Sequence, residues 1–376
     1  MRRIVYVSGT RADFGLMERT LRLMRDHPHL DVSVCVTGMH LLPRYGSTVR
    51  DIEASGVRIH SRIPVHLDGS SGAVVARAIG KMVIGMTDAL ERERPDVVLV
   101  LGDRGEMLAG AVAAMHLDIP VVHIHGGERS GTLDEPVRHA ISKLAHYHFV
   151  TTRGAKERLI RMGEQEERVY VVGAPGIDEL RELASIPRVE LCKQAGFDPE
   201  RAVGLLVFHP VHQEAREAGR QMREVMEAVL DVGLQVMCLR PNADAGGANI
   251  DAALAFYSDR ADVRIEIHLG RRVFASWMAA ADVMIGNSSS GIIEAATFGL
   301  GVVNIGSRQQ DRERGSNVVD VPCQRQHIAD ALRAMLKRGR WEVSNPYGDG
   351  RAGERIVSLL EQLPLDGGSL KKTNAY

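Results

Sequence analysis

Cysteine is scarce in this chain, and its four cysteines are far apart. They stand at positions 35, 192, 238 and 323 with no paired spacing, so the sequence indicates neither a zinc site nor a disulfide framework. Cys35 and Cys238 each lie inside an apolar run, which is typical of small core residues. We therefore expect both to be buried.

The chain also lacks an excess of charge of either sign, and it has no long apolar run. Its formal net charge is -1, with 25% charged and 44% hydrophobic residues. These values are those of a globular protein and argue against a general binder of nucleic acid or of membrane surfaces. The first residues, Met-Arg-Arg-Ile, lead directly into a strand-like run, so we expect no signal peptide, no membrane span and a cytoplasmic location.

Short β-branched runs alternate with longer helical patterns along all 376 residues. This alternation predicts βαβ units with parallel sheets, and the length suits two domains. The strands expected in the first half are residues 4–8, 32–37, 97–101, 121–124, 148–151 and 169–172. Those expected in the second half are residues 204–208, 235–239, 263–267, 283–285, 302–305 and 318–321. The pattern predicts an α/β protein made of two Rossmann-like, doubly wound domains that face each other across a cleft.

The break between the domains is expected after Val172, where Gly-Ala-Pro-Gly interrupts the pattern. We assign residues 1–174 to the first domain and residues 175–352 to the second. A last helix at about residues 353–363 has no strand after it. Residues 366–376 contain Gly, Ser and Lys, and there we expect a flexible tail.

The densest set of polar groups follows the apolar run that ends at Ile124. The sequence HIHGGERSGTLDEPVRH occupies positions 123–139, and its titratable side chains include His125, Glu128, Asp134, Glu135 and His139. Parallel strands present their site at the carboxyl edge of the sheet, and proton transfer needs several titratable groups close together. The alternative is a solvated, charged loop.

Two other strand ends of the first half carry polar groups. Ser-Gly-Thr-Arg follows the first strand, so that Arg11 lies where backbone N–H groups attract anions, although the dinucleotide glycine fingerprint is absent. Asp103 and Arg104 follow the apolar run 97–101. Asp103 is either the cap of the next helix or a site residue.

Two strand ends of the second half suggest a nucleotide site. Residues 286–291 read Gly-Asn-Ser-Ser-Ser-Gly before a helix, which would let a phosphate approach the helix N-terminus, and Glu294 lies one turn further on. The loop 306–315 contains three arginines that could clamp a diphosphate. The alternatives are a serine-capped helix and a solvated charge run. His209 and Asn242 follow two more strands.

Taken together and in this order, these motifs resemble those of the hydrolysing branch of the UDP-N-acetylglucosamine 2-epimerase family. The matching motifs are GTRAD at 9–13, VTGMH at 36–40, GDR at 102–104, HIHGGE at 123–128, SGT at 130–132, RHAISK at 138–143 and residues 286–291 with Glu294. The resemblance implies a GT-B arrangement whose final helix packs back on the first domain. It further implies hydrolysis of UDP-N-acetylglucosamine to UDP and N-acetylmannosamine through a glycal-like intermediate, at the entry to sialic acid synthesis.

The resemblance also implies roles for single residues. It identifies Asp103, Glu128, Asp134 and His125 as the catalytic set. It implies that the substrate is bound by Arg11, Arg104, His209, Asn242, Ser288, Ser289, Ser290, Gly291, Glu294, Arg308 and Arg312. Many relatives carry Glu where this chain has His125, and either His125 or Glu128 would then transfer the proton. No carboxylate or cysteine spacing supports a metal site at His123 and His125, so neither metal nor cofactor is expected.

Several related functions remain open at this point. The first rival is the same chemistry on nucleotide-linked N,N'-diacetylbacillosamine, which feeds legionaminic acid. The others are a non-hydrolysing UDP-sugar 2-epimerase, whose usual His-Val-Glu-Ala-Gly strand end this chain lacks, a glycosyltransferase of the same fold, and a nucleotide-sugar binding module. The expected partners are the UDP-sugar and UDP, with no nucleic acid and no membrane. A homodimer or a dimer of dimers is the expected assembly.

Overall fold

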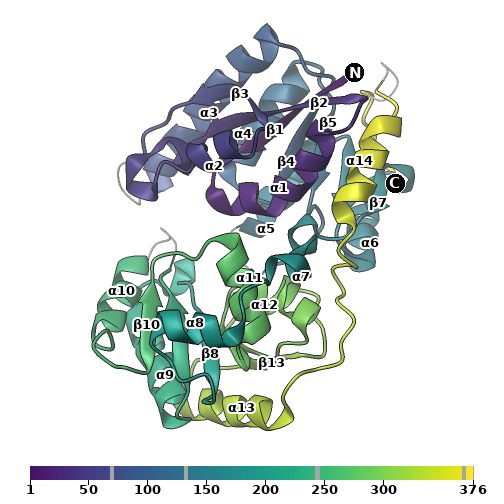
Figure 1. Ribbon diagram of the computed structural model, residues 1–376. Helices are drawn as coiled ribbons and strands as arrows, with labels where there is room; N and C mark the ends of the chain where they lie inside the picture. The colour runs from purple at the N-terminus through teal and green to yellow at the C-terminus, as the bar shows by residue number, and fades with distance from the viewer. Residues whose placement is uncertain (68–71, 131–133, 242–245, 366–369, 376) are drawn as a thin grey trace. The chain divides into compact units, whose positions relative to one another are not determined.

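The computed structural model describes residues 1–67, 72–130, 134–241, 246–365 and 370–375, although the side chains of Arg44, Asp134 and His212 are not described. The chain divides into two compact units (Figure 1). Unit 1 comprises Met1–Arg129, Leu133–Asp178 and Tyr347–Tyr376, and unit 2 comprises Ser130–Thr132 and Glu179–Pro346. Each unit is built on one parallel sheet, which confirms the predicted α/β class with two doubly wound domains.

The sheet of unit 1 has seven strands in the order β3-β2-β1-β4-β5-β6-β7, and all its pairings are parallel. The strands are β1 (Arg2–Ser8), β2 (Leu30–Thr37), β3 (Arg58–Ile63), β4 (Val97–Leu101), β5 (Val121–Ile124), β6 (Tyr147–Val150) and β7 (Val169–Val171). Six of them were predicted. The edge strand β3 was missed because its sequence, RIHSRI, is mostly polar and is exposed or half-buried along most of its length.

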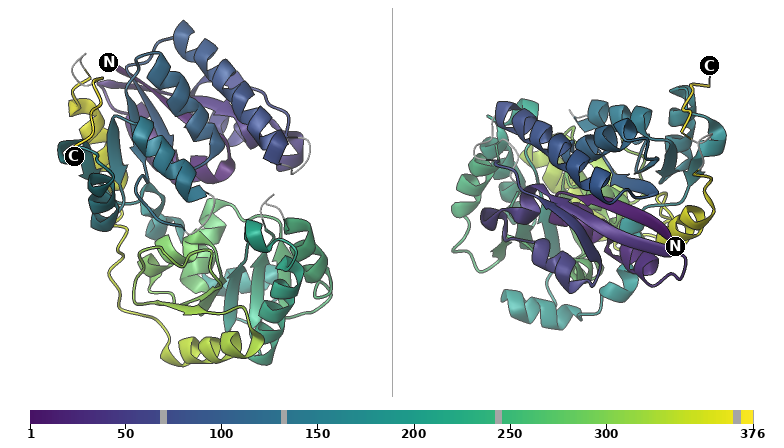
Figure 2. Two further views of the ribbon diagram at one scale, coloured as in Figure 1. Left: turned by 180° about the vertical axis from the view of Figure 1, so that it is seen from behind. Right: turned by 90° about the horizontal axis from the view of Figure 1, so that it is seen from above.

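Helices cover both faces of this sheet (Figure 2). One face packs on α1 (Arg11–Arg25), α2 (Val49–Ala54) and α14 (Ala352–Gln362). The other packs on α3 (Gly72–Arg92), α4 (Gly105–His116) and α5 (Asp134–Leu144). Alternate residues of β1 point to the two faces, with Ile4 and Tyr6 in the first core and Val5 and Val7 in the second. The remaining helices of unit 1 are α6 (Arg153–Arg161), η1 (Gly38–Leu41), η2 (Pro43–Tyr45), η3 (Glu166–Arg168) and η4 (Pro175–Ile177).

The last helix, α14, lies beside α1 in unit 1, although the whole of unit 2 precedes it in the chain (Figure 1). The buried carboxylate of Asp178 accepts hydrogen bonds from the N–H groups of Ala352 (3.0 Å) and Gly353 (2.6 Å) at the start of the helix. Carboxylates stabilise a helix at this position because they satisfy free N–H groups and oppose the helix dipole. Asp178, where the chain leaves unit 1, is therefore hydrogen-bonded to the start of α14, soon after the chain returns to unit 1.

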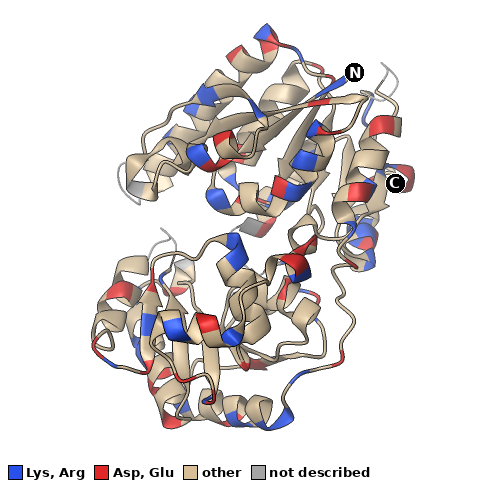
Figure 3. Ribbon diagram, in the orientation of Figure 1, with Lys and Arg blue, Asp and Glu red and all other residues tan. Residues whose placement is uncertain are grey.

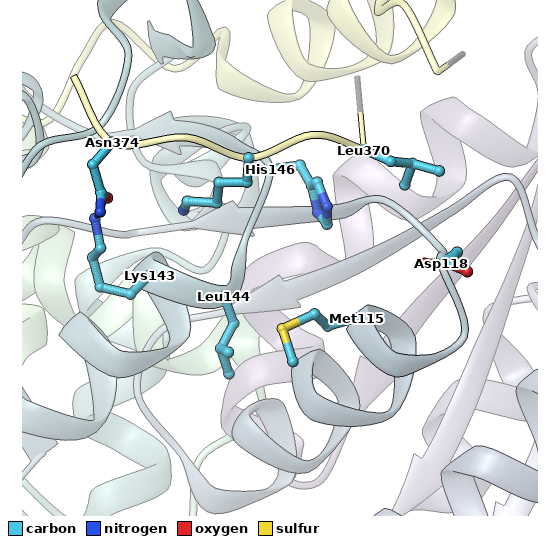
Figure 4. Close-up of a pocket in the computed structure, with 8 residues that line it drawn as sticks. Met115, Asp118, Lys143, Leu144, His146, Leu370 and Asn374 are labelled. Carbon is cyan, nitrogen blue, oxygen red and sulfur yellow. Dashed lines mark hydrogen bonds between the residues drawn. The ribbon is translucent and has the colours of Figure 1, made fainter. Parts of the chain in front are cut away.

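Residues 370–375, the described part of the C-terminal stretch, lie against α5 and the start of β6 (Figure 4). Lys143 Nζ donates to Asn374 Oδ1 at 2.7 Å, and the N–H of Ala375 donates to the carbonyl of Gly163 at 2.9 Å. Between this segment and the helices lies a pocket whose lining includes Met115 and His146. His146 directly precedes β6, so this pocket lies at the amino edge of the sheet.

Unit 2 has a six-stranded parallel sheet in the order β10-β9-β8-β11-β12-β13. The strands are β8 (Val203–Val207), β9 (Gln235–Leu239), β10 (Val263–Glu266), β11 (Val283–Gly286), β12 (Val302–Ile305) and β13 (Val318–Val321). The helices are α7 (Leu180–Leu183), α8 (Arg188–Ala195), η5 (His212–Glu214), α9 (Ala218–Asp231), α10 (Gly247–Ala255), α11 (Arg271–Ala280), α12 (Ser289–Ile293), η6 (Ala295–Phe298) and α13 (Arg325–Arg338). One face packs on α9, α10 and α13, and the other packs on α7, α8 and α11.

Basic and acidic residues are interspersed over the helices of each unit in the view of Figure 3, in keeping with the net charge of -1. Within the described ranges, no helix combines the length and the apolar character that a membrane span requires.

Candidate active site

Three neighbouring strands of unit 1 end at the same edge and bring the predicted polar residues together. Beyond the strand ends, the N–H of Gly102 donates to the carbonyl of Ile124 (2.9 Å), and the N–H of His125 donates to the carbonyl of Phe149 (3.1 Å). These bonds continue the pairing of β4 with β5 and of β5 with β6 by one residue. The loops that carry Asp103 and His125 are therefore fixed by backbone as well as by side chains.

Arg138 of α5 connects two of the predicted catalytic carboxylates. Its Nη2 donates to Asp103 Oδ2, and its Nη1 lies 4.0 Å from Glu128 Oε2. The side chains of Arg138 and Glu128 are buried, whereas that of Asp103 is 22% exposed. A buried guanidinium between two carboxylates attracts both and holds them in place. Asp103 therefore contacts a buried cation, and in this structure it is not the cap of α4, whose cap residue is Arg104.

Glu128 also binds His125 and Thr151. Its Oε1 lies 2.8 Å from His125 Nδ1, and it accepts a hydrogen bond of 2.9 Å from Thr151 Oγ1. Both His125 and Glu128 are buried, with 7% and 5% of their surface exposed. Asp103, His125 and Glu128 thus form one cluster with Arg138 and Thr151.

His123 has a structural role in the same region. Its Nε2 lies 2.7 Å from the carbonyl of Gly102 and its Nδ1 lies 2.9 Å from Ser142 Oγ, so both ring nitrogens have partners. Burial is the main reason that the pKa of His123 falls to about 3. Nowhere in the part of the chain that the structure describes do His, Cys, Asp and Glu side chains form a group that could hold a metal ion.

The fourth predicted catalytic residue, Asp134, begins α5, but its side chain lies outside the described ones. Arg11 lies on the first turn of α1 and pairs with Asp51 at 3.3 Å. Arg104 pairs with the buried Glu106 at 3.3 Å. Glu106 packs so closely on the loop after β1 that a Cβ at Gly9 would lie 2.4 Å from Glu106 Cγ.

Sequence reasoning missed a buried network below the first loop. Asp13 accepts hydrogen bonds from Ser8 Oγ, from Thr10 Oγ1 (2.8 Å) and from the N–H of Thr10 (2.6 Å), while Ser8 Oγ also lies 2.9 Å from His40 Nε2. Burial raises the pKa of the Asp13 carboxyl, and the nearby His40 opposes that rise. Thr10 and Asp13 form a capping box at the start of α1. Their three-residue spacing is a sequence signal that could have revealed this part of the network.

In unit 2, His209 and Arg308 meet around Asn287. The N–H of His209 donates to Asn287 Oδ1 (2.7 Å), and Asn287 Nδ2 donates back to the carbonyl of His209 (2.8 Å). Arg308 Nη1 and Gln309 Nε2 each donate to the carbonyl of Asn287 at 3.1 Å. Burial, followed by the charge of Arg308, lowers the pKa of His209 to about 3. His209 is therefore a neutral imidazole beside a cation.

The serine segment 288–290 forms a tight turn at the start of α12. Ser288 is the N-cap, and its Oγ lies 2.8 Å from Ser290 Oγ and accepts a bond from the N–H of Ser290. The preceding Gly286 has φ +125°, and a Cβ there would lie 2.1 Å from the carbonyl oxygen of Val207, so only glycine fits. Gly291 is buried in α12.

Glu294, which follows α12, is buried, and its Oε2 accepts a hydrogen bond of 2.8 Å from Arg271. Burial raises the pKa of Glu294, and Arg271 opposes that effect. Sequence reasoning did not single out Arg271. In the arginine loop, Arg314 folds back onto the carbonyl of Gln309 and onto Asp320, while the N–H of Arg312 donates to the carbonyl of Gln309 at 3.2 Å. Asn242 lies outside the described residues.

Comparison with known proteins places these clusters in context. The family model described as UDP-N-acetylglucosamine 2-epimerase matches residues 22–361. The chain is 52% identical over 376 residues to a UDP-N,N'-diacetylbacillosamine 2-epimerase (hydrolyzing) of Legionella pneumophila, with 100% of both chains covered. It is 32% identical over 369 residues to a UDP-N-acetylglucosamine 2-epimerase of Neisseria meningitidis, covering 96% of this chain and 95% of the relative.

A solved structure of a UDP-GlcNAc 2-epimerase from Neisseria meningitidis, bound to UDP-GlcNAc, has the same fold. It matches with a TM-score of 0.80 at 20% identity, over 96% of this chain and 100% of that one.

Proposed function

The chain belongs to the UDP-N-acetylglucosamine 2-epimerase family, and we propose that it is a hydrolysing 2-epimerase whose substrate is UDP-linked N,N'-diacetylbacillosamine. The observation that carries this choice is the 52% identity over the full length of both chains to the Legionella enzyme. UDP-N-acetylglucosamine, the substrate first expected from the sequence, is the second candidate. A relative named for this substrate, from Neisseria meningitidis, is 32% identical.

The reaction needs two proton transfers at C2 of the sugar. A base removes the C2 proton while the C1–O bond to the nucleotide breaks, which gives a glycal-like intermediate. Water then adds to C1, and a proton returns to the opposite face of C2. We assign these transfers and the stabilisation of positive charge at C1 to Asp103, Glu128, Asp134 and His125. The contacts of Asp103 and Glu128 with Arg138 support the assignment because they hold both carboxylates in one cluster with His125.

We assign nucleotide binding mainly to unit 2. The helix start at Ser288, Ser289, Ser290 and Gly291 would bind the diphosphate through N–H and hydroxyl groups. His209, Arg308 and Arg312, with Arg11 and Arg104 of unit 1, would add positive charge or hydrogen-bond donors to the phosphates. Glu294 and Asn242 would bind ribose hydroxyls. The neutral state of His209 supports a hydrogen-bonding role rather than an ionic one.

Turnover of the two nucleotide sugars, measured side by side by proton NMR, tests the proposal. We expect kcat/KM for UDP-N,N'-diacetylbacillosamine to exceed that for UDP-N-acetylglucosamine by at least about tenfold, which corresponds to ~1.4 kcal/mol of binding in the transition state. The product should be a free sugar that is epimeric at C2, together with UDP. A preference for UDP-N-acetylglucosamine would move the assignment to the second candidate, and a UDP-linked product would contradict hydrolysis.

Isotope labelling tests the mechanism separately. Turnover in D2O should place one deuterium at C2, and turnover in oxygen-labelled water should place the label at C1, because the nucleotide leaves with its bridging oxygen. A product that keeps the original C2 hydrogen would contradict elimination and indicate a redox epimerisation.

A further inference from the structure

His125 has a backbone conformation that a non-glycine residue rarely adopts. It directly follows β5 and has φ +63°, in the left-handed region. This conformation costs about 1–3 kcal/mol and persists only where the surroundings hold it, most often at functional sites. Here the N–H of His125 is bonded to the carbonyl of Phe149 at 3.1 Å, and the side chain is 9% exposed. The strain therefore places an imidazole at a fixed position on the carboxyl edge of the sheet.

One ring nitrogen of His125 is held by a carboxylate. Nδ1 lies 2.8 Å from Glu128 Oε1, which also accepts from Thr151 Oγ1. Since an ionised carboxylate only accepts hydrogen bonds, Nδ1 must carry a hydrogen. When the ring is neutral, Nε2 then carries the lone pair.

That second nitrogen, Nε2, is buried and has no hydrogen-bond partner among the described residues. A buried polar atom without a partner costs about 1–3 kcal/mol, so such atoms are rare unless a ligand or water completes them. His123, two residues earlier, shows the contrast because both of its ring nitrogens have partners in the protein. His123 therefore has the bonding of a structural histidine, whereas His125 keeps one ring nitrogen for a ligand, as a reactive histidine does.

We propose that Nε2 of His125 is the base that removes the C2 proton of the sugar, and that Glu128 is a positioning residue that orients the ring and stabilises its protonated form. This inference rests on the proposed function and decides between the two residues that the sequence left open. The C2–H bond breaks and its proton goes to Nε2. The electron pair of that bond forms the C1–C2 double bond, and the pair of the breaking C1–O bond leaves with the diphosphate oxygen. The imidazolium then lies beside the Glu128 carboxylate.

His125→Gly tests the proposal, because glycine adopts φ +63° without strain and leaves a space the size of the ring. We expect kcat to fall by about 10²–10⁴-fold, with the dissociation constant for UDP changed less than threefold. Added imidazole should raise the kcat of His125→Gly at least tenfold. There are two controls. Asp103→Asn should not be rescued by imidazole. His116→Asn, at an exposed position on α4, should keep full activity.

His125→Asn provides a second variant, since asparagine also tolerates this backbone conformation but cannot accept the proton as a base. It should be as inactive as His125→Gly and should not respond to imidazole. Folding of both variants is checked by circular dichroism and UDP binding.

A double-mutant cycle tests the role of Glu128. Glu128→Gln should lower kcat at least tenfold with KM changed less than threefold, yet it should cause no further loss in the His125→Gly background, because a residue that acts through His125 has no effect without it. Additive losses would contradict positioning through His125.

The outcomes separate this inference from the proposed function. Suppose that the wild type is active and His125→Gly is folded. If His125→Gly then keeps activity within tenfold of the wild type, or is inactive and gains nothing from imidazole, only the role of His125 is overturned. A wild type that releases no sugar from either nucleotide would overturn both.

Discussion

Replacing Glu164 by Gln should destabilise unit 1, because this carboxylate is the common partner of three nitrogen atoms. Glu164 is 3% exposed and follows α6. It lies 2.9 Å from His148 Nε2, 2.7 Å from Lys143 Nζ and 2.7 Å from Lys372 Nζ. Lys372 belongs to the C-terminal segment, so the carboxylate also attaches that segment to the domain.

The size of the effect follows from the pKa of Glu164. Burial by itself raises that pKa, but the bonds and charges of His148, Lys143 and Lys372 outweigh it and bring the value from 4.5 to about 2. Each unit of difference is worth about 1.4 kcal/mol, so the charged form contributes about 3 kcal/mol to the stability of the fold. Because the pKa of this acid is lower in the folded chain, the contribution is complete above about pH 4.5 and is lost as the pH falls toward 2.

Urea unfolding at pH 7 and at pH 3 measures this. Trp277 and Trp341 are the two tryptophans of the chain and both belong to unit 2, so tryptophan fluorescence follows unit 2, whereas hydrogen exchange of peptides from β6 and residues 370–375 follows unit 1. Glu164→Gln should lower the stability of unit 1 by about 3 kcal/mol at pH 7 and by clearly less at pH 3, with the fluorescence transition unchanged.

Glu166→Gln is the matched control. Glu166 pairs with Lys156 at 3.1 Å, but its side chain is 70% exposed, so its loss should change stability by less than about 0.5 kcal/mol. The reasoning is refuted if Glu164→Gln behaves like Glu166→Gln at pH 7, or if its effect is the same at both pH values.

Three further predictions concern the candidate site. Asp103→Asn should reduce turnover by about 10²–10⁴-fold while UDP still binds in calorimetry; near-normal activity in a folded variant would limit Asp103 to a structural role. Ser290→Ala should weaken UDP and the UDP-sugar by similar factors, about 2–13-fold for the loss of one hydrogen bond, and an effect on the sugar alone would show that the helix start does not face the diphosphate. Gly286→Ala should destabilise unit 2 by more than about 3 kcal/mol in fluorescence-detected unfolding, because the new Cβ meets the Val207 carbonyl at a positive φ. Gly270→Ala, with nothing within 4 Å of the new Cβ, should have little effect, and equal behaviour of the two variants would contradict the steric argument.

The architecture of each unit could be predicted from the sequence because parallel strands are buried on both faces and form continuous apolar runs. This pattern located β1 and the inner strands of unit 2, β8, β9, β11 and β12, and it placed Asp103 and His125 at the carboxyl edge of one sheet. It failed for β3, since an edge strand that is only partly covered needs no apolar run.

Partners across the chain could not be predicted in the same way. The sequence showed Asp103, Glu128 and Arg138 as polar residues in three motifs, but only the structure brings Arg138 between the two carboxylates. Similarly, no local pattern connects Lys372 with Glu164, or Asp178 with the start of α14. Periodicity along the chain reports which face of an element is buried, and this depends on neighbours within a few residues. The choice of charge partner and the left-handed backbone of His125 depend on distances between segments far apart in the chain. So does the lack of a partner for its Nε2 among the described residues. All of these are decided only when the tertiary structure forms.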